Sequence, residues 1–248
     1  MKKNILIICC ALLLVIFIIT GIILITKDDD PELIETPKQE EVVKRDLSQE
    51  EHNAILKRVN DLKRLDYLDK SFKPIELSNQ EVLQFASTLV DMEGIEFSKL
   101  EEIAKNYLDF SLEPENLLCM THFNKLGTSD YSYIYNTDTK KFSKNTNHIS
   151  HKETGYYSNI YNFAVDQGRF EDNKYIFKVY KVFSDTSAKH NYYKSYGDAV
   201  LEQNELSVGS NSLNDNDIKK YVNDLKVYTY TFELKDNNYV LINYEIGE

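Results

Sequence analysis

Apolar residues follow the 3.6-residue period of an amphipathic helix in three consecutive stretches of the chain. The first stretch begins at Ser48 and Glu51, an S-x-x-E pattern typical of a capped helix start, and extends to about residue 68. The same pattern recurs at Ser78 and at Ser98. The three apolar stripes consist of Ile55, Val59, Leu62 and Leu65; of Val82, Phe85, Ala86, Leu89 and Val90; and of Leu100, Ile103, Ala104, Tyr107 and Leu108. We therefore predict three helices, the first of which is a stalk or a helix lying against the main domain.

After about residue 115 the apolar period changes from 3.6 to 2, which indicates strands. The predicted strands are YSYIY (131–135), YNFAV (161–165), KYIFKVYKVF (174–183), VYTYTFEL (227–234) and YVLINYEI (239–246). Apolar residues on both faces of 174–183 favour a central strand covered on both sides. In the last strand we expect Val240, Ile242, Tyr244 and Ile246 on one face. We expect an Asp- and Asn-containing turn at 171–173, between the strands 161–165 and 174–183, and a hairpin turn at 235–238 between the last two strands.

Helices followed by antiparallel strands predict an α+β fold, in which the helices pack on one face of a curved antiparallel β-sheet. The order of the elements is similar to that of cone-shaped sheet-and-helix folds of the nuclear-transport-factor or cystatin type. This similarity is an analogy of element order alone. Such scaffolds carry enzymes and pure binding modules alike, so the fold class does not decide the function.

A continuous apolar run precedes these elements and occupies residues 5–25. At about 1.5 Å per residue, a helix of this length spans the roughly 30 Å hydrocarbon core of a bilayer. No small-residue cleavage pattern follows the run. Cys9 and Cys10 lie near its beginning, whereas a lipid-attachment cysteine follows the apolar stretch. We therefore predict an uncleaved transmembrane signal anchor over residues 5–26.

The charges that flank the anchor predict its orientation. Lys2 and Lys3 lie on one side, and Lys27 followed by three aspartates lies on the other. Because basic residues favour the cytoplasmic side, we expect the N-terminus in the cytoplasm and the bulk of the chain outside, in a single-pass protein of the cell membrane. The expected organisation is a cytoplasmic tail (1–4), the anchor (5–26), a charged linker (27–47), a juxtamembrane helix and connector (48–76) and an extracytoplasmic α+β domain (77–248).

The charge of the chain excludes some partners. It has 29 Lys and Arg against 40 Asp and Glu, for a formal net charge of −11, and three of the lysines precede residue 28. Nucleic acid and anionic lipid surfaces require a basic surface, so we expect neither as a partner of the exterior part. The abundance of Lys, Asn, Ile and Tyr indicates an AT-rich genome, such as that of a low-GC bacterium.

Residues with metal-binding or nucleophilic chemistry are few. His148 and His151, with Glu153 nearby, are the weak candidates for a metal site, but no second ligand cluster completes it, and the flanking residues indicate a solvated loop. Cys119 precedes His122 by three residues, which in a strand would put them on opposite faces, so we predict a buried structural cysteine. Glycine-rich phosphate loops and the G-x-S-x-G pattern do not occur. We predict no cofactor and no metal.

One long segment between strands, residues 184–216, has no clear periodicity. Loops of this length inside a compact domain are uncommon unless they are functional or mobile. The segment contains Tyr192, Tyr193 and Tyr196, which are the candidate binding residues. The alternative interpretation is a decorated loop with a short helix.

These observations favour a non-catalytic binding or scaffolding domain at the bacterial cell envelope, with an envelope protein as its partner. The alternative function is that of an extracytoplasmic hydrolase whose site is not visible as a local motif. A pocket with converging polar groups and shifted pKa values would favour the enzyme, and an open surface would favour the binding module. The sequence makes no prediction of oligomeric state.

Overall fold

The computed structural model describes residues 44–119, 131–147, 160–164, 168–184, 192–201, 205–206 and 221–247. These residues form an α+β fold within the compact unit Val42–Glu248. Its helices are α2 (Gln49–Leu62), α3 (Asn79–Ser87), α4 (Phe97–Leu108) and α6 (Tyr196–Leu201), with the 3-10 helices η1 (Lys63–Leu68), η2 (Pro74–Glu76) and η3 (Val222–Asp224). Its strands are β1 (Arg45–Asp46), β2 (Leu117–Leu118), β3 (Tyr131–Asn136), β4 (Lys141–Lys144), β5 (Ile160–Ala164), β6 (Arg169–Glu171), β7 (Lys174–Ser184), β8 (Tyr192–Tyr193), β9 (Glu205–Leu206), β10 (Val227–Lys235) and β11 (Asn238–Ile246).

Two of the three predicted helix starts are confirmed. The Ser48 hydroxyl accepts a hydrogen bond from the backbone of Glu51 (3.2 Å), whose carboxylate accepts one from the backbone of Ser48 (2.8 Å). Ser78 begins α3 with the same capping box. The predicted cap at Ser98 is wrong, because the N-cap of α4 is Glu96, two residues earlier, and the helix begins at Phe97. The backbone N–H of Phe97 donates to the carbonyl of Lys140 (3.0 Å), and this pairing with the turn before β4 sets where the helix begins.

The first predicted helix is part of the main core. Its apolar stripe is buried, with Ile55 and Val59 at 0% exposure, and it belongs to the same hydrophobic cluster as the other helices and the sheet. The α-helix ends at Leu62, and the chain continues as η1 to Leu68. Asp69 ends the 3-10 helix with a left-handed backbone conformation (φ 44°). The helix therefore lies against the domain and is not a stalk.

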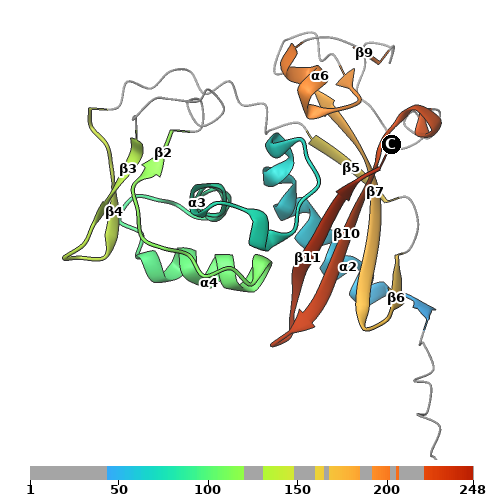
Figure 1. Ribbon diagram of the computed structural model, residues 1–248, viewed down its shortest axis with the longest axis horizontal. Helices are drawn as coiled ribbons and strands as arrows, with labels where there is room; N and C mark the ends of the chain where they lie inside the picture. Colours follow the sequence, from blue (N-terminus) through green and yellow to red (C-terminus); the bar gives the residue numbers. More distant parts are fainter. Residues whose placement is uncertain are drawn as a thin grey trace, which may run out of the picture. The chain divides into compact units, whose positions relative to one another are not determined.

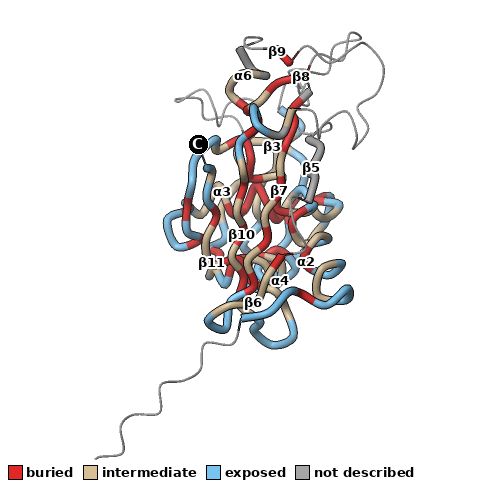
Figure 2. The backbone as a smooth tube through the Cα atoms, turned by 90° about the vertical axis from the view of Figure 1, so that its right-hand side faces the viewer, coloured by how far each residue is buried: buried red, intermediate tan, exposed pale blue. Residues whose placement is uncertain are grey.

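The larger sheet is antiparallel and has the strand order β1-β6-β7-β10-β11, with β5 and β8 also pairing with β7 and β9 with β8 (Figure 1). Strand β7 is central, as predicted, because it pairs with β10 and β8 along one side and with β5 and β6 along the other. The buried residues concentrate along β7 and β10 (Figure 2).

The prediction that β7 is covered on both sides is wrong for most of the strand. Its core face is buried throughout, whereas on the other face Ile176, Lys178 and Tyr180 are only partly buried. Only Val182 on that second face is fully covered, by a small cluster that includes Tyr192 and the residues Leu206 and Leu225. Most of this face of the sheet is therefore open to solvent.

Both predicted turns are confirmed in position, but the first joins β7 to β6, a strand that was not predicted, instead of to the 161–165 strand. Asp172 and Asn173 join β6 to β7, and Asp236 and Asn237 join β10 to β11, all four with positive φ between 47° and 62°. Asn and Asp tolerate this conformation better than other non-glycine residues, and two such residues in succession match a two-residue hairpin turn.

A register shift in the last hairpin corrects the predicted face of β11. Thr231 pairs with Asn243 but Phe232 pairs with Leu241, so Ile242 is an extra residue in β11. Such a β-bulge reverses the alternation of side chains along the bulged strand. Tyr244 consequently shares the core face with Leu241, and both are buried in the main hydrophobic cluster.

Strands β2, β3 and β4 form a separate antiparallel sheet, and this differs from the single sheet predicted. Helix α3 contacts β2 and α4 contacts β11, so these two helices lie between the two sheets (Figure 1). Two glutamines of α3 pair with the edge of β2. The Gln80 carbonyl accepts from Leu118 N–H (3.2 Å), and the Gln84 amide donates to Leu118 O (3.1 Å). These side chains take the place of a neighbouring strand.

Within the described residues, no helix is both long and apolar enough to span a bilayer. The predicted anchor and cytoplasmic tail, residues 1–26, lie outside the described part of the chain.

Candidate functional site

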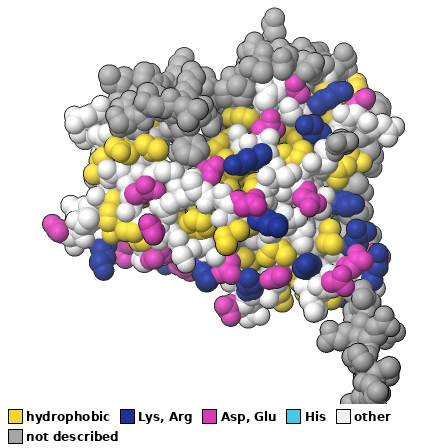
Figure 3. All heavy atoms as spheres, in the orientation of Figure 1, with side chains coloured by type: hydrophobic (Ala, Val, Ile, Leu, Met, Phe, Trp, Pro, Cys, Tyr) yellow, Lys and Arg dark blue, Asp and Glu magenta, His cyan; other side chains and the backbone are white. Residues whose placement is uncertain are grey.

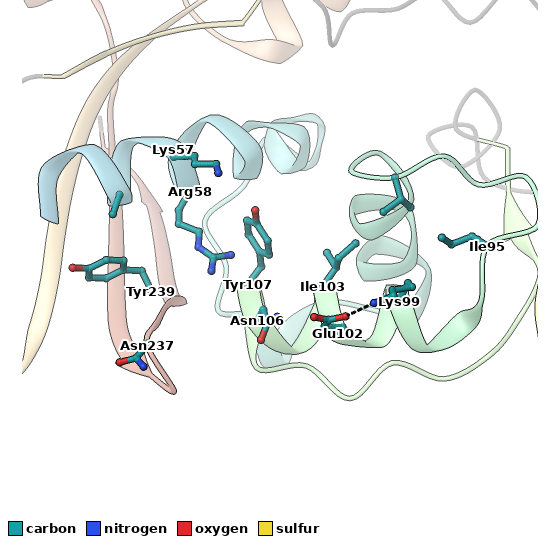
Figure 4. A pocket seen from close by; sticks show the side chains of 12 residues that line it. Lys57, Arg58, Ile95, Lys99, Glu102, Ile103, Asn106, Tyr107, Asn237 and Tyr239 are labelled. Carbon is teal, nitrogen blue, oxygen red and sulfur yellow. Dashed lines mark hydrogen bonds and ion pairs between the residues drawn. The ribbon is translucent and has the colours of Figure 1, made fainter. Parts of the chain in front are cut away.

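An open groove of 670 Å³ lies between α2, α4 and the turn of the β10–β11 hairpin (Figure 4). We call it the helix–hairpin groove. It is lined by Ala54, Lys57, Arg58, Val90, Ile95, Lys99, Glu102, Ile103, Asn106, Tyr107, Asn237 and Tyr239. The lining residues from α4, from Lys99 to Tyr107, lie on one side of that helix because they follow the spacing i, i+3, i+4, i+7 and i+8. Its volume is in the range of ligand sites.

The floor of the helix–hairpin groove is apolar. Five partly buried side chains there pack against the main core, namely Val90, Ile95, Ile103, Tyr107 and Tyr239. Because they rest on buried residues, their positions are set by the core and do not depend on an occupant. The exposed part of these side chains is apolar surface that a bound partner would remove from water.

Arg58 and Tyr107 form the centre of the groove. The Arg58 guanidinium lies 4.0 Å from the centroid of the Tyr107 ring, and its Nη2 donates to Asn238 Oδ1 (2.8 Å). The Tyr107 hydroxyl donates to Asp61 Oδ2 (2.7 Å). Burial and this hydrogen bond raise the pKa of Tyr107 to about 12. Tyr107 is therefore neutral at physiological pH and supplies a ring face.

The rim of the groove is basic. It carries Lys57, Arg58 and Lys99 against one acid, Glu102, which is paired with Lys99 (3.2 Å). Among the described residues, neither Lys57 nor Arg58 has a carboxylate oxygen within 4.0 Å. This local excess of positive charge contrasts with the formal net charge of −11 for the chain. On the face drawn in Figure 3, by comparison, acidic and basic side chains are interspersed.

A second constellation of cation and tyrosines lies inside the core. Lys181 of β7 is 0% exposed and forms an ion pair with Asp66 of η1, which is 3% exposed. The ammonium also donates to the hydroxyls of Tyr230 (2.5 Å) and Tyr244 (3.3 Å), and Tyr244 donates to Asp66 Oδ1 (2.8 Å). The ring centroids of Tyr228, Tyr230 and Tyr244 lie 4.5, 5.0 and 5.1 Å from Lys181 Nζ. We call these five residues the Lys181 network.

The Lys181 network has ionisation properties that follow from burial. Burial lowers the pKa of Lys181 to about 8, against the opposing effect of Asp66. Burial also raises the pKa of Asp66, against the opposing effect of Lys181. The network joins η1 to the adjacent strands β7, β10 and β11. None of its residues lines the helix–hairpin groove or a second groove of 610 Å³, which lies on the open face of the sheet over β6, β7, β10 and β11, so we assign it a structural role.

The candidate binding tyrosines lie in the core. Tyr192, Tyr193 and Tyr196 are 5%, 1% and 8% exposed. The long segment that contains them is not structureless in its described residues, because β8 extends the sheet by pairing Tyr193 with Phe183 and α6 follows it. The three side chains are thus buried in the described structure, and their role as binding residues stays a prediction.

The candidate metal ligands His148 and His151 lie outside the described residues. Within the described residues, no group of three or more His, Cys, Asp and Glu side chains could hold a metal ion. Cys119 is 0% exposed, which confirms the prediction of a buried cysteine, whereas His122 lies outside the described residues.

The sequence interpretation missed the residues that form the two constellations. Lys181 had a visible signal, because it occupies a position on the otherwise apolar face of the 174–183 strand. Tyr107 belongs to the apolar stripe of its helix, and Arg58 lies on the polar side of the first helix without a distinguishing pattern. The helix–hairpin groove combines residues from both helices and from the last hairpin, which no local pattern connects.

Comparison of the chain with models of protein families, with curated proteins and with solved structures finds no match.

Proposed function

We propose that this chain is a membrane-anchored protein of the bacterial cell envelope whose α+β domain binds another protein and does not catalyse a reaction. The helix–hairpin groove carries the proposal. It combines partly buried apolar side chains on a fixed floor with two cations that have no carboxylate partner among the described residues. Clustered apolar surface with a polar rim is the usual composition of a protein interaction site.

The alternative, an extracytoplasmic hydrolase, is less well supported by the same groove. A general base or nucleophile requires a pKa near the working pH. In this groove the two tyrosines have raised pKa values, mainly because of burial, and so remain neutral. The Lys181 network does contain a lysine with a pKa of about 8, but its ammonium and carboxylate are enclosed in the core.

The proposed location follows from the apolar run at residues 5–25. An anchor with its N-terminus in the cytoplasm would hold the domain outside the cell, on a charged linker. The cone-shaped folds of the nuclear-transport-factor or cystatin type stay an analogy of element order.

Site-specific photocross-linking in the cells from which the gene comes tests the proposal. The full chain carries a benzoylphenylalanine in place of Ile103, on the floor of the groove, or in place of Lys178, on the open face of the sheet. We expect one discrete cross-linked protein from position 103 and not from position 178. Absence of a cross-link at position 103, or the same cross-links from both positions, would contradict a partner site in the groove.

Membrane attachment is tested separately by protease treatment of intact spheroplasts that produce the full chain. We expect the domain to be digested from outside while it sediments with the membrane beforehand. A domain that is protected from the protease, or that does not sediment with the membrane, would contradict the proposed location. It would not bear on the groove as a binding site, which cross-linking tests.

A further inference from the structure

We propose that the helix–hairpin groove binds an acidic peptide segment of its partner, in which two or more carboxylates flank one large apolar side chain. The inference rests on the proposed binding function and adds the chemistry of the occupant.

The charge of the occupant follows from the two unpaired cations. Lys57 and Arg58 are adjacent on α2, and Arg58 is held in place by Asn238 and by the ring of Tyr107. Both of these partners of Arg58 are neutral, so the guanidinium keeps its full charge and its free N–H groups for an incoming carboxylate. An arginine fixed on an aromatic ring is well suited to bind a carboxylate, because less side-chain freedom is lost when the contact forms.

The apolar part of the occupant follows from the floor. Ile103 and Tyr107 are one helical turn apart on α4, whereas Tyr239 of β11 lines the other end of the groove with its ring pointing away from them and packed on Tyr175 (Figure 4). The Arg58 guanidinium lies over the Tyr107 ring, so an apolar side chain on Ile103 and Tyr107 would place neighbouring carboxylates at the basic rim. Along α4 the groove runs from Lys99 to Tyr107, which is about 12 Å at 1.5 Å per residue. That length accommodates a few residues of an extended peptide.

The same charges argue against nucleic acid as the occupant. A nucleic-acid site neutralises several phosphates along a backbone and needs a stripe of Lys and Arg. The groove offers two unpaired cations among the described residues, in a chain with a formal net charge of −11. An isolated acidic segment can be attracted to this local positive site, whereas a long polyanion would be repelled by the surrounding acids.

The groove on the open face of the sheet provides a comparison within the molecule. It has 610 Å³ and is lined by four cations and three acids, together with Thr, Asn and two isoleucines. Arg169 there is paired with Glu171 (3.3 Å), whereas Lys73, Lys174 and Lys178 have no carboxylate oxygen within 4.0 Å among the described residues. The two grooves therefore differ in their balance of cations and acids and in their apolar floor. Its surface is more polar and its charges are nearly balanced, so we expect no selection for acidic peptides at that groove. Lys178 supplies a matched lysine for a control substitution.

The test is a selection of displayed random 12-residue peptides for binding to the purified full chain in mild detergent. We expect the enriched peptides to combine acidic residues with an aromatic or large aliphatic residue. A synthetic peptide from this set is then titrated, by fluorescence anisotropy, against the wild-type protein and three variants, Lys57→Glu, Ile103→Ser and Lys178→Glu. We expect Lys57→Glu and Ile103→Ser each to weaken binding about tenfold, and Lys178→Glu to leave it unchanged. Thermal melts show whether each variant is folded.

The possible outcomes separate the inference from the proposed function. Enriched peptides that are basic or uncharged, or an affinity that is the same for Lys57→Glu and wild type, would overturn the acidic occupant while leaving a cross-link at position 103 intact. Loss of binding in Lys178→Glu alone would assign the peptide to the open sheet face and also overturn the inference. Failure to enrich any peptide would also overturn the inference. It would leave the proposed function standing, because cross-linking tests that function separately.

Discussion

In two regions of this molecule a cationic side chain lies over tyrosine rings, and the regions differ in whether a carboxylate neutralises the cation. Lys181 is enclosed by three tyrosines and paired with the carboxylate of Asp66, at 0% exposure. Arg58 stacks on Tyr107 at the surface and has only neutral partners among the described residues. The first cation is satisfied from within the chain. The second retains an unused charge beside apolar surface.

The comparison shows that residue type alone does not decide between a structural and a binding role. Both constellations use the attraction between a cation and the face of an aromatic ring. In the core, removal from water makes an unpaired charge costly, so the carboxylate of Asp66 is needed for folding. At the surface, water stabilises the guanidinium in the absence of a partner, and the charge remains free to bind one.

The largest expected effect comes from breaking the buried pair. Lys181→Met removes the ammonium and leaves Asp66 as a buried charge with Tyr244 as its remaining donor. We expect the free energy of unfolding to fall by about 3–5 kcal/mol, measured by urea denaturation. The double variant Lys181→Met/Asp66→Asn is the control, because it removes both charges, and it should recover most of the loss. Equal instability of the single and double variants would show that the pair is not what stabilises this part of the core.

The next effect tests whether the segment around β8 belongs to the core. Tyr193 is 1% exposed and pairs across the sheet with Phe183, so Tyr193→Ala should cost about 3 kcal/mol. Lys194→Ala is the neighbouring control, since this side chain is 38% exposed and its ion pair with Asp224 is long (3.9 Å), and we expect less than about 0.5 kcal/mol. A negligible effect of Tyr193→Ala would restore the interpretation of this segment as an exposed recognition loop.

Much of the fold was predictable because its signals are local. The capping boxes at Ser48 and Ser78, the two Asp–Asn turns and the alternation in β3, β7 and β10 depend on neighbours within a few residues. The bulge at Ile242 was not predictable, since it adds one residue without changing the apolar pattern. The separation of β2–β4 into a second sheet depends on helix packing, which the strand pattern does not contain.

The candidate site was much less predictable, because its residues come together only in the folded chain. Asp66 and Lys181 are 115 positions apart, and Arg58 and Asn238 are 180 apart. Tyr192, Tyr193 and Tyr196 drew attention because their segment lacks a clear period. The described residues of that segment form two short strands and one short helix, so these three side chains are buried without a long regular pattern.

The pH dependence of stability provides a further test of the buried pair of Lys181 and Asp66. Burial raises the pKa of Asp66, and loss of the neighbouring ammonium should raise it more. A carboxyl whose pKa is higher in the folded than in the unfolded state favours folding in acid and loses this contribution as pH rises through its folded pKa. The loss of unfolding free energy in Lys181→Met, relative to wild type, should therefore be smaller at about pH 5 than at about pH 8, by roughly 1–2 kcal/mol. Urea denaturation at both pH values measures this, and a difference of the opposite sign would contradict the raised pKa.

The surface constellation should contribute much less to stability. Arg58→Ala removes the stacking on Tyr107 and the hydrogen bond to Asn238, for which we expect about 1 kcal/mol. Thermal denaturation against wild type measures the effect. A loss as large as that of Lys181→Met would place Arg58 among the structural cations and remove the contrast between the two regions.

The most direct test of the central claim is the yield of the cross-link from position 103 when the rim charge is reversed. The account predicts that Lys57→Glu strongly reduces the cross-linked product in cells, whereas the matched reversal Lys178→Glu, on the open face of the sheet, leaves it unchanged. An equal yield in the two variants, with both folded, would contradict the claim that the unpaired cations of the helix–hairpin groove bind the partner.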